Sequence, residues 1–178
     1  MNIDQASPPG PSTQDGRGAL RWGIKSSFVK YVESAPDGTR TASGVVEIPG
    51  ETGPVFEFPL TATSTGADGT LTLRFSGSVQ FQAHHGMLDV HLSSPTVTFK
   101  DGWADVSVLD MSPSGAAHAV RIARFESDIP TTADGRVSAR SSEVLLTTQG
   151  SQLLGDVYPA RTVLEPITLD ASFQGDIQ

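Results

Sequence analysis

Apolar and polar residues alternate along most of the chain between residues 41 and 125. A period of two places apolar side chains on one face of a β-strand and polar side chains on the other. Together with one segment near the end of the chain, this pattern predicts a series of short strands. They are Thr41–Ile48, Pro54–Leu60, Thr70–Ser76, Gly77–His84, Met87–Ser93, Thr96–Lys100, Trp103–Leu109, Ala117–Arg124 and Ile167–Phe173. Asp-Gly pairs at 68–69 and 101–102 stand between apolar runs and predict hairpin turns.

Two segments have a helical pattern instead. The first runs from Leu20 to Val32 and ends before the turn signal Pro36-Asp37-Gly38. Its apolar face comprises Leu20, Ile24, Ser27, Phe28 and Tyr31. The second, Leu145–Leu154, predicts a short helix near the end of the chain. We therefore predict a mainly β fold, an antiparallel sheet or sandwich-like domain with one N-terminal amphipathic helix and a short C-terminal helix.

The first 18 residues differ from the rest of the chain. They contain three prolines and three glycines and almost no apolar residue. Such a segment buries too little surface to offset its ordering entropy, so we predict a disordered N-terminal arm over residues 1–18. The remaining residues, 19–178, have a length typical of one domain.

Composition excludes several classes of function. The chain has no cysteine, which excludes disulfides, thiolate metal sites, iron–sulfur clusters and cysteine nucleophiles. A net charge of −8, with 12 scattered Lys and Arg residues, argues against nucleic acid as a partner. No apolar stretch approaches the roughly 20 residues that a membrane span needs. The first residues lack the pattern of a signal peptide, so a cytoplasmic location is expected if Met1 is the natural start.

Candidate chemistry is concentrated in two segments, of which the predicted N-terminal helix is the first. It carries Tyr31, one of two tyrosines, and Ser27 lies one turn before it. Two hydroxyl groups in an apolar stripe contribute little to an amphipathic helix unless a polar group lies against them. The alternative is a tyrosine whose ring packs on the protein and whose hydroxyl reaches water.

The second segment, residues 77–95, holds three of the four histidines. His84 lies on the polar face of one predicted strand and His85 follows at the turn, while Asp89 and His91 share the polar face of the next strand. A solvated hairpin face and a zinc site formed by these residues both remain open. A Ser–His–Asp hydrolase has little support, because no G-x-S-x-G sequence occurs.

The same segments carry a resemblance to the haem-transport-associated (HtaA) domain of actinobacterial haem uptake systems. Residues 20–31, LRWGIKSSFVKY, are similar to the family's opening W-G-[VI]-K-x-S-F-x-x-Y signature. The resemblance continues at Phe56–Pro59 and at Gly77–Asp89, and it ends at Leu146–Gly150 and Tyr158–Leu169. It covers nearly everything after residue 19, in the family's order.

The resemblance implies that Tyr31 is the axial ligand of ferric haem b and that His84 hydrogen bonds to its phenolate. His85 leaves open which of the two histidines is the partner. Such a site is chemically coherent, because bound Fe³⁺ favours the anionic form of an oxygen ligand and a neighbouring histidine tunes it. Haem ligation by tyrosine has precedent.

The resemblance also implies the surroundings of the haem. Ser27 corresponds to a serine that contacts a haem propionate, and a nearby Lys or Arg is expected to assist it. Tyr158 corresponds to one of two aromatic residues near the pocket, and Val157 stands where the other would be. Ile24 and Met87 are candidate pocket-wall residues against which the porphyrin would lie.

The function that these residues imply is haem acquisition or relay by a haemophore-like, non-enzymatic module. Expected partners are haem and a haem receptor or another haem-binding domain, and relatives are exported or held at the cell envelope. The alternative is a structural or adhesive β-domain that has lost haem binding. An enzyme would need a distal catalytic acid or base, for which the sequence offers no convincing candidate.

Overall fold

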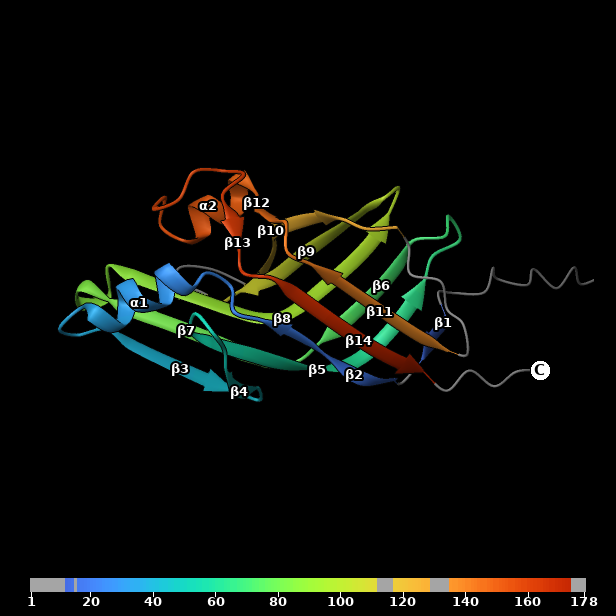
Figure 1. The fold of residues 1–178 in the computed structure, drawn as a ribbon, viewed down its shortest axis with the longest axis horizontal. Coiled ribbons are helices and arrows are strands. Elements are labelled where there is room, and N and C mark those ends of the chain that lie inside the picture. Colours follow the sequence, from blue (N-terminus) through green and yellow to red (C-terminus); the bar gives the residue numbers. More distant parts are fainter. Residues whose placement is uncertain (1–11, 15, 112–116, 129–134, 174–178) are drawn as a thin grey trace, which may run out of the picture.

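The computed structural model describes residues 12–14, 16–111, 117–128 and 135–173 (Figure 1). Within these residues, a sheet of 14 strands carries two α-helices and one short turn, η1. In chain order the elements are β1 (Ser12–Gln14), β2 (Gly16–Trp22), α1 (Ser26–Ser34), β3 (Thr39–Ser43), β4 (Val46–Pro49), β5 (Pro54–Thr65), β6 (Leu71–Phe75), β7 (Ser78–Ala83), η1 (His84–Gly86), β8 (Leu88–Lys100), β9 (Trp103–Asp110), β10 (His118–Glu126), β11 (Arg136–Ser141), β12 (Val144–Leu146), α2 (Thr148–Leu153), β13 (Val163–Leu164) and β14 (Ile167–Phe173). The predicted mainly β, antiparallel fold is confirmed.

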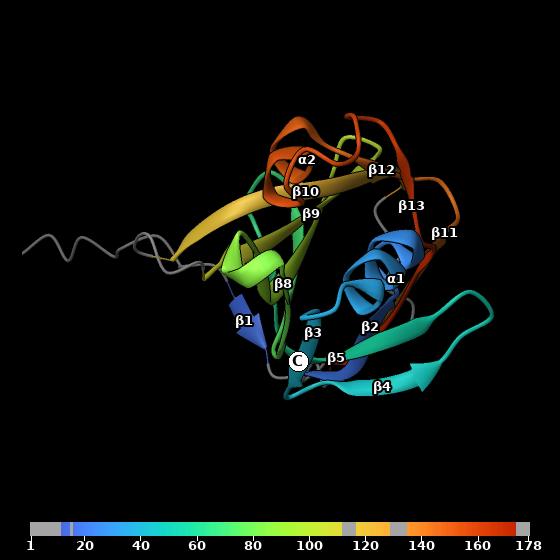
Figure 2. The same ribbon diagram turned by 90° about the vertical axis from the view of Figure 1, so that its left-hand side faces the viewer.

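The sheet curls on itself (Figure 2). Its strands follow the order β11-β14-β2-β5-β6-β8-β9-β10-β12-β13, with β3 joined through β7 and with β1 and β4 joined to β5. Helix α1 lies within the curve of the sheet at one end of the molecule, where it packs against β3 and β7, and α2 packs against β10 (Figures 1 and 2). One face of α1 is thereby buried, and the other face is presented at this end of the molecule.

Strand β8 pairs with different neighbours along its length. It is a single strand of 13 residues, although the pattern predicted two strands, Met87–Ser93 and Thr96–Lys100. Its register with β9 shifts within Ser93–Thr96, where Ser94 has a left-handed φ of 47°. A bulge of this kind bends a strand and accommodates the missing amide of Pro95. Because of the bend, the first half of β8 pairs with β7 and the second half with β6.

Aromatic packing fixes α1 to the sheet. The ring of Phe81 on β7 packs edge-to-face on Phe28 of α1, with centroids 5.3 Å apart, and on Phe56 of β5 at 6.4 Å. All three rings are buried in the hydrophobic core. The backbone of α1 is therefore held by its inner face, and side chains on its outer face are left free for other contacts.

Both predicted Asp-Gly turns are confirmed. Asp101 and Gly102 have φ values of 51° and 79° and form a two-residue connection between β8 and β9, as type I′ hairpins require. At the tip of the β5–β6 hairpin, Gly69 has a φ of 83°, and the carboxylate of Asp68 accepts the amide of Thr70 at 3.1 Å. In both hairpins the Asp-Gly pair therefore lies in the turn that joins the two paired strands.

The N-terminal helix begins later than predicted. Gly16–Trp22 is strand β2, which pairs with β14 on one edge and with β5 on the other. The helix covers Ser26–Ser34. Ile24, which lies between β2 and α1, has a φ of 64°, and this left-handed value is incompatible with a right-handed helix. Leu20, Trp22 and Ile24 are spaced by two, so their pattern suits a strand as well as a helix. Pairing on both edges decides in favour of the strand.

Part of the predicted disordered arm, residues 1–18, pairs with the sheet in the structure. Residues 12–14 form β1, which pairs with β5, and residues 16–18 begin β2. Residues 1–11 lie outside the described part of the chain. Pairing with strands that follow much later in the sequence therefore orders a segment whose composition favours disorder.

Two other predicted elements divide into shorter ones. Thr41–Ile48 is split near Gly44, whose φ of 69° separates β3 from β4. Leu145–Leu154 is split into β12 and α2 at Thr147, whose hydroxyl caps the helix by accepting the amide of Gly150 at 2.9 Å. Strands β11 and β13 were not predicted.

No helix among the described residues is long and apolar enough to cross a membrane.

Candidate ligand-binding site

Helix α1 begins where the connection between β13 and β14 meets it. Glu165 of this connection accepts hydrogen bonds from the Ser26 amide at 3.0 Å and from the Ser26 hydroxyl at 2.6 Å, and Thr52 adds one at 3.2 Å. Burial alone would raise the pKa of Glu165, but the bonds from Ser26 and Thr52 and the charge of Lys25 lower it below its ordinary value. A carboxylate therefore caps the first turn of the helix, where the helix dipole favours a negative charge.

The same connection holds the turn before the helix. The Glu165 amide donates to the carbonyl of Ile24 at 2.9 Å, and the Glu165 carbonyl accepts the indole N–H of Trp22 at 3.1 Å. Ile24 has no exposed surface. Its side chain is enclosed in the core and presents no surface to a ligand in this structure, and its role as a pocket-wall residue stays a prediction.

Tyr31 lies on the outer face of α1, one turn after Ser27. Phe28 and the valines of the helix point into the core, whereas Tyr31 is 42% exposed. The Tyr31 hydroxyl lies 2.7 Å from Nε2 of His84, and the centroids of the two rings are 5.6 Å apart. The structure therefore brings the predicted pair together at the surface, although 53 residues separate them in the chain.

His84 stands on a left-handed turn at the tip of the β7–β8 hairpin. The φ values of His84, His85 and Gly86 are 55°, 56° and 82°. Asp37, in the turn that follows α1, accepts the amide of His85 at 2.5 Å and the amide of His84 at 3.1 Å. The bond from His85, followed by the bond from His84, lowers the pKa of Asp37 below its ordinary value. An ionised carboxylate thus joins the end of α1 to the turn that carries His84.

The two adjacent histidines have different surroundings. His84 contacts Tyr31, whereas the side chain of His85 is 95% exposed and lies 3.7 Å from Asp37 through Nδ1. His84 is therefore the histidine that bonds to the tyrosine in this structure. Met87, directly after η1, is 90% exposed, and its role as a pocket-wall residue stays a prediction.

Ser27 meets the segment that follows α2. Its Oγ lies 2.7 Å from the hydroxyl of Tyr158, whose carbonyl accepts the hydroxyl of Ser151 at 2.5 Å. Lys25 places Nζ 5.7 Å from the centroid of the Tyr158 ring and donates to the carbonyl of Val163 at 3.1 Å. Two hydroxyl groups and one ammonium group therefore gather at the first turn of the helix that carries Tyr31.

The remaining polar residues of the histidine hairpin do not form a metal site. Asp89 accepts the side-chain amides of Gln80 at 2.9 Å and Gln82 at 3.2 Å, so its carboxylate is already occupied. In the part of the chain that the structure describes, no group of three or more His, Asp or Glu side chains is arranged to hold a metal ion. The structure therefore does not support a zinc site at this hairpin.

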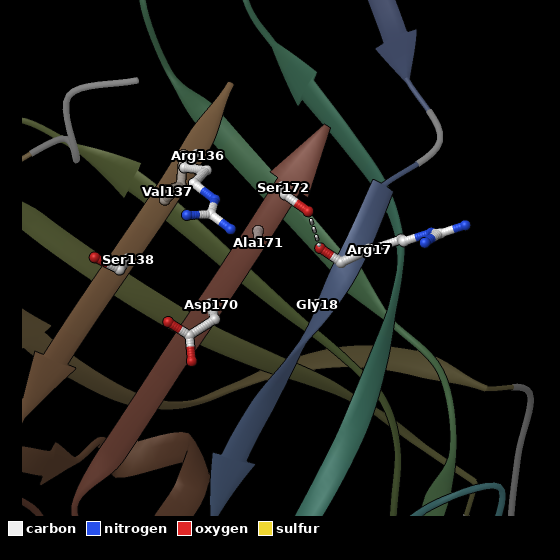
Figure 3. Close-up of a pocket in the computed structure, with 8 residues that line it drawn as sticks. All are labelled: Arg17, Gly18, Arg136, Val137, Ser138, Asp170, Ala171 and Ser172. Atoms are coloured by element: carbon white, nitrogen blue, oxygen red, sulfur yellow. Dashed lines mark hydrogen bonds between the residues drawn. The ribbon is translucent and has the colours of Figure 1, made fainter. Parts of the chain in front are cut away.

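An open hollow of about 480 Å³ lies elsewhere, over β2, β11 and β14 (Figure 3). It is lined by Arg17, Gly18, Arg136, Val137, Ser138, Asp170, Ala171 and Ser172. Figure 3 shows the side chain of Arg17 directed away from that of Arg136, and Asp170 is paired with Arg21 at 3.1 Å. The charged groups of this hollow do not converge on a common point, and none of the predicted site residues lines it.

Three residues of the site were not identified from the sequence. In the sequence Asp37 belongs to a turn signal, and Glu165 and Lys25 lie in segments that carry the family resemblance. Each acts on a residue or segment that is remote in the chain, so a local pattern does not indicate its partner. The one available signal was the position of Lys25 and Asp37 at the two ends of the tyrosine helix.

Fold and site together define a class of protein, a curled antiparallel β-domain that presents a helix tyrosine bonded to a histidine at its surface. The chain belongs to the Htaa family, because the HtaA family model matches residues 17–170. The resemblance predicted from the sequence motifs is confirmed. A comparison with curated proteins found no match.

Solved structures of Corynebacterium glutamicum proteins share the fold. The C-terminal domain of HtaA is 24% identical, with a TM-score of 0.73 and coverage of 92% of this chain and 100% of that one. The N-terminal domain of HtaA is 20% identical, with a TM-score of 0.71 and coverage of 91% and 99%. Heme binding protein HtaB is 18% identical, with a TM-score of 0.67 and coverage of 93% and 96%.

Proposed function

We propose that this protein binds ferric haem b through the oxygen of Tyr31 and takes part in haem acquisition or relay. The observation that carries the proposal is the 2.7 Å contact between the Tyr31 hydroxyl and Nε2 of His84 at an exposed face of α1. Membership of the Htaa family and the shared fold of heme binding protein HtaB support it.

The residues present suit such a ligand. Ferric haem supplies a Lewis-acidic iron that favours an anionic oxygen donor. Tyr31 presents its oxygen from a helix whose inner face is fixed by Phe28, so the donor is held in place before binding. His84 accepts the phenol proton at Nε2 if its own proton is on Nδ1, and it then donates to the phenolate. The pair thereby supplies both the ligand and the group that adjusts its basicity.

The polar group at the start of α1 suits the propionates of haem. Ser27 and Tyr158 offer hydroxyl donors 2.7 Å apart, and Lys25 offers a positive charge beside the Tyr158 ring. Lys25 is the residue that we assign as the basic partner of a propionate. The exposed side chain of Met87, directly after the turn that carries His84, would provide apolar surface for the porphyrin.

We further propose that the module is non-enzymatic and passes haem to a receptor or to another haem-binding domain. An anionic oxygen ligand favours ferric over ferrous iron, so reduction or transfer to a stronger ligand releases the cargo. The exposure of Tyr31 supports transfer, because a partner can approach the ligand without opening the core.

A haemin titration tests the proposal, with absorbance spectra of the wild-type protein, Tyr31→Phe, His84→Ala and Tyr158→Phe. Tyr158→Phe is the matched control, because it removes the only other phenol. We expect saturable one-to-one binding with phenolate-to-iron charge-transfer bands. His84→Ala should weaken binding by about 10- to 100-fold, the usual effect of removing a partner of a metal ligand, and Tyr31→Phe should weaken it further.

The charge-transfer bands should survive in Tyr158→Phe and disappear in Tyr31→Phe. Bands that persist in Tyr31→Phe would show that the ligand assignment is wrong. Weak, unsaturable binding that is the same in all four proteins would instead favour a structural or adhesive domain that has lost haem binding.

A further inference from the structure

The turn that carries His84 has an unfavourable backbone conformation. His84, His85 and Gly86 are three consecutive residues with φ values of 55°, 56° and 82°. Left-handed geometry is easy for glycine and unfavourable for other residues, which adopt it as single residues rather than in succession. An interaction outside the turn must therefore compensate for the two histidines.

Asp37 supplies that interaction. Successive amides in such a turn point to one side and form a concave site for an anion. One carboxylate oxygen of Asp37 accepts the His84 amide at 3.1 Å, and the other accepts the His85 amide at 2.5 Å. Asp37 itself lies in the turn directly after α1, so this internal anion joins the end of the tyrosine helix to the histidine turn.

The backbone of the histidine turn is also held by the pairing of Ala83 with Leu88 and by the bond from the Met87 amide to the His84 carbonyl at 3.1 Å. The side chain of His85 is 95% exposed, and Met87 beside it is 90% exposed. Among the described residues, Asp37 and Tyr31 are the side chains outside η1 that hydrogen bond to it. Apart from Tyr31 itself, Asp37 is thus the side chain outside η1 by which the described part of the chain hydrogen bonds to this turn.

We propose that Asp37 is a positioning residue for the Tyr31–His84 pair, holding the left-handed turn so that His84 Nε2 meets the Tyr31 oxygen. Its role in the haem-free protein follows from the geometry alone. The effect of Asp37 on haem binding rests on the proposed function. Asp37 bonds to the amides of His84 and His85 and not to the Tyr31 oxygen or the His84 ring, so its effect is transmitted through the backbone of η1.

The first test uses the haem-free protein and compares Asp37→Asn and Asp37→Ala with Asp68→Asn. Asp68 is a matched control, because its carboxylate also accepts a backbone amide in a turn, at the tip of the β5–β6 hairpin remote from α1 (Figure 1). The measurements are amide hydrogen exchange of His84 and His85 and the nuclear Overhauser effect between the rings of Tyr31 and His84.

We expect exchange at His84 and His85 to accelerate by about tenfold or more in both Asp37 variants and to stay unchanged in Asp68→Asn. The ring-to-ring signal should weaken in the Asp37 variants alone. Unchanged exchange and an unchanged ring signal in Asp37→Ala would overturn the proposal. Asp37→Asn keeps the shape of the turn residue and one acceptor oxygen, so it guards against a simple folding failure.

The second test uses ferric haem. The charge-transfer bands of Asp37→Asn should move toward those of His84→Ala, and haem release should accelerate by about tenfold, whereas Asp68→Asn should match the wild type. If the wild-type protein shows no tyrosine-dependent binding, the proposed function fails, and the haem-free test still decides the role of Asp37. If the wild type binds and Asp37→Asn has a wild-type spectrum and release rate, the positioning role fails alone.

Discussion

The two ends of helix α1 are held by the same chemical group in different surroundings. At the start, the Glu165 carboxylate accepts the amide and hydroxyl of Ser26, and the backbone of Glu165 also bonds to Trp22 and Ile24, which are buried. At the end, the Asp37 carboxylate accepts two amides of an exposed hairpin tip. The first carboxylate joins the helix to the core, and the second joins it to the candidate site.

Because of this difference, we expect changes at one end of α1 to affect the stability of the fold and changes at the other end to affect the geometry of the candidate site. A change at the start of α1 disturbs partly buried groups that lose some of their water when the chain folds, so we expect its effect in the free energy of unfolding. A change at the end of α1 disturbs groups that remain in contact with water in either state. We therefore expect its effect in the Tyr31–His84 contact, with little change in global stability.

The largest change in the free energy of unfolding should come from the buried face of α1, between its two ends. Phe28→Ala removes a ring that is buried against Phe81, and substitutions of this kind cost about 3–5 kcal/mol. Unfolding in urea would measure the loss, with Val46→Ala as a control at an exposed strand position, where we expect a change within about 0.5 kcal/mol. A loss as small as that of the control would contradict the anchoring of α1 by its inner face.

The next effect should come from the helix start and should depend on pH. Glu165→Gln removes the charge and one strong acceptor, and we expect it to cost about 1 kcal/mol at neutral pH. The pKa of Glu165 is lowered from 4.5 in the folded protein, so its stabilisation is complete above that pH and is lost as the pH falls through the folded value.

The stability difference between the wild type and Glu165→Gln should therefore shrink with acidification. Urea unfolding of both proteins at pH values on either side of 4.5 measures it. A difference that grows toward acid would show that the folded protein binds this proton more tightly than the unfolded chain, which contradicts the hydrogen bonds to Ser26 and Thr52.

The smallest effect should come from the hydroxyl pair beside the helix start. Tyr158→Phe keeps the ring near Lys25 and removes the bond to Ser27, so we expect a decrease in haem affinity of about threefold. The melting temperature should stay close to that of the wild type. Haemin titration and thermal unfolding measure the two quantities, and a loss of stability without a loss of affinity would assign the pair to the fold instead of the site.

Local sequence patterns predicted the fold class because the alternation of apolar and polar residues is set by the two faces of a strand. They did not indicate the strand at Leu20–Trp22, whose spacing suits two structures, or the pairing of residues 12–14, whose composition favours disorder. In both places the outcome depends on backbone pairing with β5, which lies more than 30 residues away along the chain. A local window contains no information about that pairing.

The chain by itself determined the strand alternation, the two Asp-Gly turns, the tyrosine on a helix and the histidines at a hairpin. Family motifs, also read from the sequence, paired Tyr31 with His84. Only the tertiary structure decided that His84 rather than His85 meets the tyrosine, that Ile24 is enclosed, and that Asp37 and Glu165 hold the two ends of α1. The physical reason is that hydrogen bonds and burial are properties of groups brought together in space, and here the curl of the sheet brings them together.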